Sequence, residues 1–333
     1  MLKIAINGFG RIGRAAFKIA LEKNNLKVAA INDLTNAGTL AHLLKYDTAY
    51  GRYEKGVKSA EGKIIAEEQE FTVYAEPDPA KLPWKELKID VVLECTGRFV
   101  KDGAAAAHIK AGAKKVIISA PAKGKGNIPT FLLGVNEEKY SGEEVISNAS
   151  CTTNCVAPIT QIIDSYFGIE KALMTTIHSY TADQNLQDGP HKDLRRARAA
   201  AQNIAPTTTG AAIATAKVIP NIENLFDGMA IRVPTVIVSL SDLTFLLKKD
   251  TTADKINKTL TEVSKEDRFK GILKVTNEPI VSSDIIGDSY SSIADISLTK
   301  VVGGNLVKII AWYDNEWGYA NRLVELAEYI SHK

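Results

Sequence analysis

A turn with three closely spaced glycines follows the first apolar run of the chain: Gly8, Gly10 and Gly13. The run Leu2–Asn7 predicts a β-strand, and the pattern over Arg11–Lys23 predicts a helix. Glycines between a strand and a helix let the backbone approach a pyrophosphate, which the free N–H groups of the helix N-terminus attract. We therefore predict a dinucleotide-binding turn, in preference to a purely structural one.

The choice of cofactor depends on Asp33, about 20 residues beyond that turn, at the end of a second predicted strand, Val28–Asn32. A carboxylate at this place can accept hydrogen bonds from an adenosine ribose. Its neighbour is Leu34 and not an arginine, so a 2′-phosphate would face negative charge without a compensating cation. The sequence therefore favours NAD over NADP.

The pattern of secondary structure changes near residue 150. Before it, apolar strands such as Ile89–Cys95 and Val116–Ser119 alternate with helical segments such as Asp102–Gly112, which predicts an α/β domain with a doubly wound parallel sheet of the Rossmann type. After it, longer β-like runs predict an α+β domain with a mostly antiparallel sheet. These runs are Leu173–Tyr180, Met229–Val233, Thr235–Leu247, Ser292–Val302 and Asn305–Tyr313.

Other segments of the second half have their own signals. Gly303-Gly304 predicts a tight hairpin between the last two runs. Helices are predicted over Thr252–Val263 and Asn315–Ile330, the latter with an apolar stripe. The stripe consists of Leu323, Leu326, Ala327 and Ile330. The polar segment 181–203 predicts either a functional loop or a disordered linker.

Composition excludes several classes of protein. At 333 residues the chain is long enough for two domains, each with its own core. A net charge of +2 does not fit a chain built around nucleic acid or an anionic membrane, and no apolar stretch approaches the ~18 residues that span a bilayer. Three cysteines do not form a disulfide framework, and free thiols without a signal peptide predict a cytoplasmic protein.

Cys151 is the candidate nucleophile, within the segment Ala149–Cys155. Ser150 is a suitable N-cap for a helix that runs to about Tyr166 and ends at Gly168. A cysteine in the first turn of that helix meets free N–H groups and the positive end of the dipole, so we expect a lowered thiol pKa. The residues alone leave a second interpretation open, in which Cys151 is a small buried core residue.

Further side chains could complete a site around this thiol. His178 ends a strongly apolar strand and is either a base at a cleft or a buried core histidine. Cys155, one turn beyond Cys151, is predicted to be structural. No metal site is expected, because the spacing of the two cysteines is poor for zinc and no histidine pair follows. The basic run Leu194–Arg198 is either a phosphate site or a solvated surface, and the absence of an extended basic stripe predicts no dedicated nucleic-acid site.

Together these motifs resemble the glyceraldehyde-3-phosphate dehydrogenase family over the full length of the chain. The matching segments are INGFGRIGR at 6–14, SAPAKG from Ser119, ASCTTNC at 149–155, HSYTADQ at 178–184, HKDLRRARAAA at 191–201, PTTTGAA at 206–212, RVPT at 232–235 and WYDNEWGYANR at 312–322. The resemblance implies an NAD-binding domain at 1–150, completed by the C-terminal helix 315–333, and a catalytic domain at 151–314. It also implies a homotetramer in which the loop 181–203 lies near a neighbouring subunit's cofactor.

The resemblance implies a role for each matching position. Cys151 would be the nucleophile, and His178 would activate it. The NAD contacts would come from Gly8, Gly10, Arg11, Ile12, Gly13 and Asp33, with Ser119 and Asn315 near the nicotinamide. Inorganic phosphate would be held by Ser150, Thr152, Thr209 and Gly210. The phosphate of the substrate would be held by Thr181, Arg196 and Arg232.

The implied activity is the glycolytic oxidation of D-glyceraldehyde 3-phosphate to 1,3-bisphosphoglycerate, with NAD reduction, through a thiohemiacetal and a thioester on Cys151. Erythrose-4-phosphate dehydrogenase, which uses water in place of phosphate, is one alternative, and Thr181 and the pair Thr209-Gly210 argue against it. A non-catalytic NAD-binding or redox-sensing protein is the other alternative. The presence of the thiol, the histidine and the phosphate motifs together argues against a pure sensor.

Two positions depart from the family pattern. Pro77 stands where many members have an arginine, so one contact to the dinucleotide would be missing. Gly189 stands where many NAD-specific members have a leucine, which loosens a steric barrier to a 2′-phosphate. The departure at Gly189 leaves some use of NADP open, and the two departures together weaken the preference for NAD.

Overall fold

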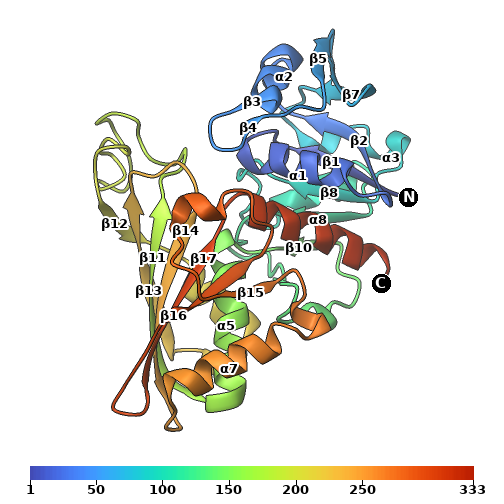
Figure 1. The fold of residues 1–333 in the computed structure, drawn as a ribbon. Coiled ribbons are helices and arrows are strands. Elements are labelled where there is room, and N and C mark those ends of the chain that lie inside the picture. Colours follow the sequence, from blue (N-terminus) through green and yellow to red (C-terminus); the bar gives the residue numbers. More distant parts are fainter. The chain divides into compact units, whose positions relative to one another are not determined.

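The chain folds into two compact units, drawn in Figure 1 from a computed structural model that describes all of residues 1–333. The first, here called the N-unit, consists of Met1–Phe131, Glu138–Ala149 and Ala320–Lys333. The second, the C-unit, consists of Leu132–Glu137 and Ser150–Tyr319. None of the helices combines the length and the apolar character that crossing a membrane requires.

An eight-stranded sheet forms the N-unit, in the order β10-β9-β8-β1-β2-β7-β6-β5. Its strands are β1 (Leu2–Asn7), β2 (Leu26–Asn32), β5 (Val57–Ala60), β6 (Lys63–Ala66), β7 (Gln69–Tyr74), β8 (Val91–Glu94), β9 (Lys115–Ile118) and β10 (Val145–Ser147). From β10 to β7 all pairs are parallel, which confirms the predicted Rossmann-type sheet. The antiparallel strands β5 and β6 and the helix α2 (Ala37–Lys45) were not predicted from the sequence.

Close packing explains the glycine turn that leads from β1 into α1 (Arg11–Leu21). Gly8 has φ +93°, a conformation that residues with a Cβ rarely adopt. A Cβ on Gly13 would lie 2.1 Å from the carbonyl oxygen of Gly8, so a side chain there would push the helix away from the strand. The sequence therefore needs glycine at both places for the helix to start directly above the end of β1.

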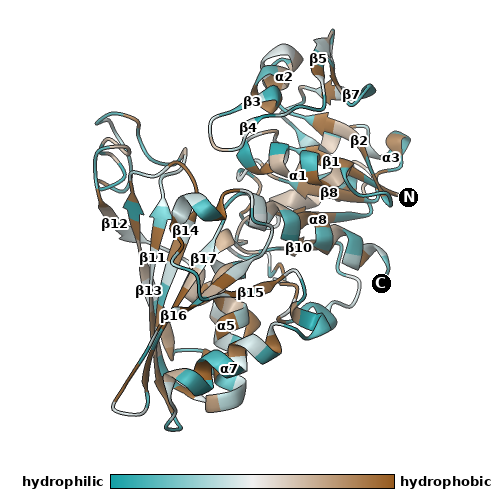
Figure 2. Cartoon of the chain, in the orientation of Figure 1, coloured by the Kyte–Doolittle hydropathy of each residue, from teal (hydrophilic) through white to brown (hydrophobic).

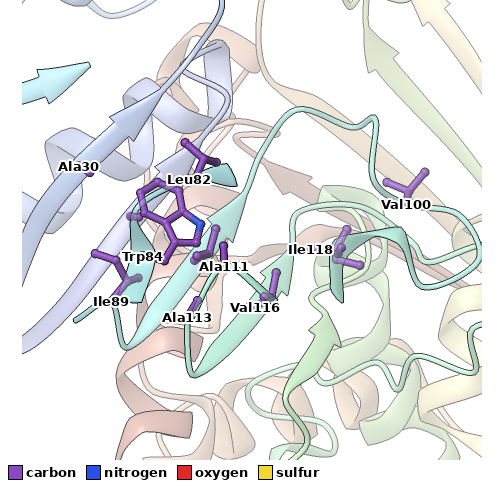
Figure 3. Close-up of a cluster of buried hydrophobic side chains, with 12 residues drawn as sticks. Ala30, Leu82, Trp84, Ile89, Val100, Ala111, Ala113, Val116 and Ile118 are labelled. Carbon is purple, nitrogen blue, oxygen red and sulfur yellow. The ribbon is translucent and has the colours of Figure 1, made fainter. Parts of the chain in front are cut away.

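A cluster of buried residues around Trp84 fills the core on one side of the N-unit sheet (Figure 3). Trp84 begins the short helix α3 (Trp84–Leu87) and is fully buried. Ala111, at the end of α4 (Ala107–Lys110), belongs to the same cluster, as does Val116 of β9. Burial of apolar side chains on this scale is the main force that holds the helices to the sheet.

The helix predicted over 102–112 is confirmed only in part. The segment forms a 3₁₀ helix at Ala104–Ala106 and then α4. Asp102 and Gly103 both have positive φ, 52° and 74°, so neither can belong to a right-handed helix.

The C-unit is built on a seven-stranded, mostly antiparallel sheet in the order β12-β13-β11-β14-β17-β16-β15, which confirms the predicted α+β pattern. Its strands are β11 (Ile169–Ser179), β12 (Ala205–Thr208), β13 (Phe226–Val233), β14 (Ser239–Leu247), β15 (Leu273–Thr276), β16 (Ser292–Val302) and β17 (Leu306–Tyr313). The helices α5 (Cys151–Phe167), α6 (Ala211–Val218) and α7 (Ala253–Val263) contact these strands. Figure 2 shows both hydrophobic and hydrophilic residues on α7, as expected for a helix with one buried face.

Several boundaries in the C-unit differ from those predicted. The strand expected from Thr235 begins at Ser239, because Val238 has φ +71° and interrupts the extended backbone. Between β16 and β17 the connection has three residues, Gly303 to Asn305, although both glycines have the expected positive φ. The segment 181–203 contains neither helix nor strand, as predicted for a loop.

The last helix, α8 (Trp317–Ser331), starts two residues later than predicted. The Asp314 carboxylate accepts hydrogen bonds from the backbone N–H groups of Glu316 and Trp317, so it caps the start of the helix. The four residues of the predicted apolar stripe are fully buried, which confirms the helical periodicity. Lys115 of β9 donates from Nζ to the carbonyl oxygen of Ile330 at 2.7 Å and so ties this helix to the N-unit sheet.

Candidate active site

Cys151 and His178 meet in the C-unit. Cys151 is the first residue of α5, and its predicted cap is confirmed: the Ser150 side chain accepts a hydrogen bond from the Thr153 N–H at 3.1 Å. His178 lies at the end of β11 and is 5% exposed. The distance between Cys151 Sγ and His178 Nε2 is 3.5 Å, so the thiol and the imidazole form a hydrogen-bonded pair.

Strand register places Arg232 beside this histidine. β11 and β13 are parallel neighbours, and His178 is the register partner of Arg232. Arg232 Nη1 donates to the carbonyl oxygen of Ser179 at 3.1 Å and to Thr181 Oγ1 at 3.4 Å. A guanidinium fixed in this way brings positive charge to the thiol–imidazole pair.

The hydrogen bonds of His178 determine its tautomer. Nδ1 lies 2.7 Å from the carbonyl oxygen of Ser179, which can only accept, and 3.1 Å from Arg232 Nη1, which can only donate. The carbonyl contact is the shorter of the two and places the proton on Nδ1. Nε2 is then the acceptor that faces the thiol of Cys151. Burial, helped by the charge of Arg232, lowers the pKa of His178 to about 3, so the imidazole is neutral at pH 7 and can accept a proton from the thiol.

The prediction of a lowered thiol pKa for Cys151 is wrong. Burial raises the pKa of the thiol, and it outweighs the opposing effects of Arg232, the Thr152 hydroxyl and the first-turn N–H groups. The other two cysteines, Cys95 and Cys155, are also held in the thiol form, because burial raises the pKa of each, for Cys155 to about 12. Cys155 is fully buried, as its predicted structural role requires.

Tyr313 is a part of this site that the sequence did not reveal. Its hydroxyl lies 2.9 Å from Thr152 Oγ1 and 2.8 Å from Thr176 Oγ1, and its ring packs edge-to-face on His178. The motif that contains it was noted, but nothing in the local pattern showed that the last residue of β17 would reach the start of α5. Tyr313 thus joins the helix that carries the thiol to the strand that carries the imidazole.

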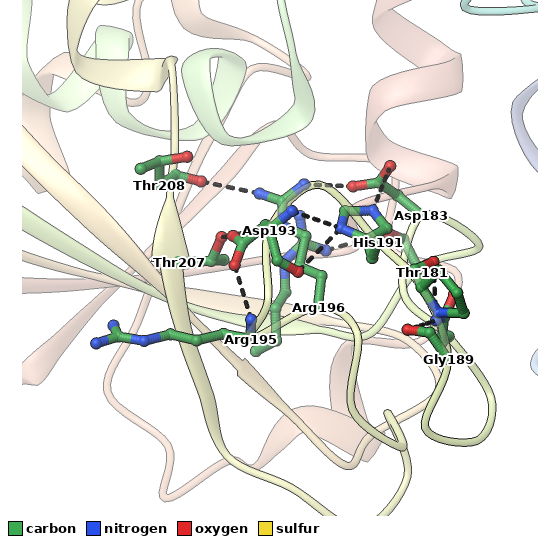
Figure 4. A network of polar contacts seen from close by, with 12 residues as sticks. Thr181, Asp183, Gly189, His191, Asp193, Arg195, Arg196, Thr207 and Thr208 are labelled. Atoms are coloured by element: carbon green, nitrogen blue, oxygen red, sulfur yellow. Dashed lines mark hydrogen bonds and ion pairs between the residues drawn. The ribbon is translucent and has the colours of Figure 1, made fainter.

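Arg196 organises the long loop at 181–203 (Figure 4). Its guanidinium donates to Thr207 Oγ1 at 2.9 Å, to the carbonyl oxygen of Thr208 at 3.0 Å and to the Asp183 carboxylate. His191 lies on the other side of Asp183, with Nε2 3.7 Å from the carboxylate. These contacts show an ordered loop and not a disordered linker. The charge of Arg196 also contributes to lowering the pKa of His178.

The other predicted phosphate ligands lie at helix starts or on buried hydrogen bonds. Gly210 is the N-cap of α6, and Thr209 Oγ1 accepts from the Ala211 N–H at 3.2 Å. Thr152 is engaged with Tyr313, and Ser150 caps α5, so both helices present their N-termini with hydroxyl groups beside them. Such helix starts attract anions.

Asn315, which was predicted to lie near the nicotinamide, is buried. Its side-chain oxygen accepts from Ser239 Oγ at 3.0 Å, which fixes the orientation of the amide.

A separate pocket of about 330 Å³ lies within the N-unit, at the C-terminal ends of its central strands. Three of the predicted cofactor residues line it: Gly8, Gly10 and Asp33. Residues that the sequence argument did not assign complete the lining: Asn7, Asn32, Leu34, Thr35, Glu76, Pro77, Cys95, Thr96, Arg98 and Phe99. Such a pocket at the carboxyl ends of parallel strands is where dinucleotides bind in this fold class.

The remaining predicted cofactor residues lie outside that lining. Arg11 Nη1 donates to the Asp47 carboxylate at 2.6 Å, and Ile12 and Gly13 follow it in α1. Ser119 comes directly after β9 and donates its backbone N–H to the carbonyl oxygen of Glu94. Asp33 accepts from the Phe9 N–H at 2.8 Å, so its carboxylate is already held against the glycine turn.

The N-unit pocket fits NAD in its physical features. The turn beneath it is free of Cβ atoms at Gly8 and Gly13, where a side chain would clash with neighbouring backbone. An acidic group stands at the end of β2, and the helix N-terminus of α1 points its free N–H groups toward the turn. No group of three or more His, Cys, Asp and Glu side chains is arranged to hold a metal ion.

The fold and these two sites define the class of the protein: an oxidoreductase that combines a dinucleotide-binding unit with a cysteine–histidine site in a second unit. Comparison with known proteins gives the family. Residues 2–102 match "Glyceraldehyde 3-phosphate dehydrogenase, NAD binding domain", and residues 150–315 match "Glyceraldehyde 3-phosphate dehydrogenase, C-terminal domain". The chain belongs to the glyceraldehyde-3-phosphate dehydrogenase family, whose cofactor is NAD.

Curated relatives cover the whole chain. The chain is 51% identical over 334 residues to glyceraldehyde-3-phosphate dehydrogenase of Geobacillus stearothermophilus, covering 100% of this chain and 99% of the relative. It is 50% identical over 335 residues to the enzyme of Streptomyces coelicolor, with the same coverage. It is 52% identical over 338 residues to the enzyme of Clostridium pasteurianum, covering 99% of each chain.

Proposed function

We propose that this chain oxidises D-glyceraldehyde 3-phosphate with NAD and inorganic phosphate, through an acyl group held on Cys151. The observation that carries the proposal is the 3.5 Å contact between Cys151 Sγ and the unprotonated Nε2 of His178. The family and the relatives support the same activity. The N-unit would serve as the NAD-binding domain and the C-unit as the catalytic domain.

The first step is attack of Cys151 on the aldehyde carbon. The thiol proton passes to Nε2 of His178 as the C–S bond forms, and Arg232 offsets the negative charge that develops nearby. The carbonyl oxygen of the substrate becomes an oxyanion, which the Cys151 backbone N–H and the newly protonated Nε2 can stabilise. Protonation of that oxygen gives a hemithioacetal on Cys151.

The second step makes a thioester and the third releases it. The chemistry that bound NAD supplies is acceptance of a hydride, whose loss turns the hemithioacetal into a thioester, while the hydroxyl proton goes to His178. A phosphate oxygen then attacks the thioester carbon, the C–S bond breaks, and the sulfur leaves as a thiolate. The product is an acyl phosphate, so the energy of aldehyde oxidation is retained and not lost to hydrolysis.

Two anion sites are needed for this sequence of steps. The phosphate of the substrate would be held by Arg232, Arg196 and Thr181. The charges of both arginines act on His178, and Arg232 donates to Thr181. The second site, for inorganic phosphate, would be formed by Ser150, Thr152, Thr209 and Gly210, at the starts of α5 and α6. We further propose a cytoplasmic homotetramer in which the 181–203 loop faces a neighbouring subunit.

Initial rates of reduced-cofactor formation test the proposal. With glyceraldehyde 3-phosphate and NAD, sustained turnover should require phosphate, and NADP should give a much lower rate than NAD because of Asp33. Equal turnover without phosphate, or a preference for erythrose 4-phosphate, would replace the proposal with a water-using dehydrogenase. Absence of turnover despite NAD binding would favour a non-catalytic sensor.

A further inference from the structure

A row of buried polar side chains crosses the C-terminal ends of three adjacent strands in the N-unit. Asn7, Asn32 and Glu94 end β1, β2 and β8 and are paired in register across the sheet. None is more than 5% exposed. Asn32 Nδ2 donates to Asn7 Oδ1 at 2.6 Å, and Asn7 Nδ2 donates to Glu94 Oε2 at 2.5 Å. Both asparagines line the N-unit pocket, and Glu94 lies outside its lining.

The row continues at both ends to groups that can only donate. At one end, Trp84 Nε1 donates to His108 Nδ1 at 2.9 Å, and His108 Nε2 lies 2.9 Å from Glu94 Oε2. At the other end, the backbone N–H of Glu76 donates to Asn32 Oδ1 at 3.0 Å, and Asn32 Nδ2 also donates to the Glu76 carbonyl oxygen. An indole N–H and a backbone N–H have no acceptor form.

These fixed ends determine the direction of every hydrogen bond between them. Because Nδ1 of His108 must accept from Trp84, the proton of the neutral imidazole is on Nε2, and it points at Glu94. Because Oδ1 of Asn32 must accept from Glu76, its Nδ2 donates to Asn7 Oδ1, and Nδ2 of Asn7 is left to donate to Glu94. Two donors therefore converge on one oxygen of the Glu94 carboxylate, and they lie side by side, with Asn7 Nδ2 3.3 Å from His108 Nε2.

The second oxygen of Glu94 receives two more donors from one residue. The backbone N–H of Thr96 donates to Oε1 at 2.8 Å, and Thr96 Oγ1 donates at 2.5 Å. Four donors around two oxygens match an ionised carboxylate, which only accepts. The same hydrogen bonds offset the cost of burying the charge, since Glu94 is 1% exposed.

Thr96 connects this carboxylate to the glycine turn. A Cβ built on Gly8 would lie 2.7 Å from the Thr96 nitrogen, so the turn and the Thr96 backbone are in direct contact. Thr96 also lines the pocket. We propose that Glu94 is a positioning residue for NAD: its buried carboxylate holds Thr96 and Asn7 on either side of the Gly8 turn in the geometry that the dinucleotide needs. The proposal rests on NAD as the cofactor and is independent of the chemistry at Cys151.

Glu94→Gln is the direct test, because a glutamine has one acceptor oxygen for four donors. In either orientation of the amide, its NH₂ group faces a donor that the row cannot turn, so Thr96 or Asn7 is displaced. The matched pair Thr96→Val and Thr96→Ser removes or keeps the hydroxyl, which donates to Glu94 and accepts from the Arg98 N–H, while the side chains of the row itself stay unchanged. The quantities to measure are the Kd of NAD by calorimetric titration, and the rate of Cys151 alkylation by iodoacetamide without NAD.

We expect Glu94→Gln to raise the Kd of NAD about tenfold and to leave the alkylation rate of Cys151 unchanged. Thr96→Val should raise the Kd about threefold, and Thr96→Ser should bind as the wild type does. No aldehyde or phosphate is present, so the result does not depend on the proposed reaction.

An unchanged Kd in Glu94→Gln overturns the proposal. So does a parallel loss of NAD binding and of Cys151 reactivity, since that would indicate general damage to the fold. If circular dichroism shows that Glu94→Gln does not fold, the threonine pair decides: equal Kd values for Thr96→Val and Thr96→Ser overturn the proposal, and a weaker Kd for Thr96→Val alone supports it.

Discussion

The two candidate sites are built in different ways. In the N-unit the central motif of the site occupies one continuous segment, Gly8–Gly13, and the pocket beside it lies at the ends of parallel strands. In the C-unit the site consists of side chains that lie far apart in the sequence, Cys151, His178, Arg232 and Tyr313. Strand register and one helix start bring these together. The comparison predicts that a substitution in one site leaves the function of the other site unchanged.

The largest effect should come from the C-unit nucleophile. Cys151→Ser replaces the sulfur with a much poorer nucleophile and should lower turnover by about 10⁴-fold or more. The Kd of NAD should remain that of the wild type, because no residue of the N-unit pocket changes. Steady-state rates and a cofactor titration check this. Full activity in the variant would remove Cys151 from the mechanism.

Loss of the imidazole should have the next largest effect. His178→Asn removes the acceptor of the thiol proton and should slow turnover by about 10²–10⁴-fold. The rate of iodoacetamide alkylation of Cys151 should then rise only at higher pH than in the wild type. His191→Asn, in the same unit but on the loop, is the control and should leave the alkylation profile unchanged. Identical profiles for His178→Asn and the wild type would contradict the role of the pair.

A change confined to the N-unit should have the opposite pattern. Gly13→Ala places a Cβ 2.1 Å from the Gly8 carbonyl oxygen, and overpacking of this kind costs about 1–3 kcal/mol of stability. NAD binding should weaken, while Cys151 alkylation without cofactor stays normal. Gly10→Ala is the matched control for stability, since its Cβ would meet no atom within 4 Å. Equal melting temperatures for the two variants would show that the turn tolerates a side chain.

The smallest expected effect is a pH dependence of stability from the C-unit. Burial lowers the pKa of His178 to about 3, so between that pH and the unfolded value the unfolded state binds the extra proton. The contribution of the neutral imidazole to the free energy of unfolding is present above about pH 6.5. It is lost as the pH falls, by at most ~1.4 kcal/mol per pH unit. Denaturant titrations of the wild type and His178→Asn between pH 7 and 5 should show a shallower loss in the variant. Parallel curves would contradict the buried neutral imidazole.

The difference between the sites also explains how much could be predicted from sequence. The glycine turn, the central strands and the cap at Ser150 are local patterns, and the structure confirms them. The helix predicted over 102–112 begins only at Ala104, because Asp102 and Gly103 have positive φ and stand before its first turn, which is 3₁₀. Tyr313 and Glu94 had no local signal, because each depends on partners that are distant in the sequence. Tyr313 contacts Thr152, and Glu94 contacts Asn7 and His108 in addition to its near neighbour Thr96. The thiol pKa had the wrong sign because burial, which one segment cannot reveal, outweighs the helix start.

The central claim is that Cys151 holds the acyl group until phosphate collects it. Its most direct test is a rapid-mixing experiment with glyceraldehyde 3-phosphate and NAD in the absence of phosphate, followed by peptide mass analysis. We predict a burst of about one NADH per active site, an acyl adduct on the peptide that contains Cys151, and renewed turnover when phosphate is added. Sustained NADH formation without phosphate, or a burst that leaves Cys151 unmodified, would contradict the account.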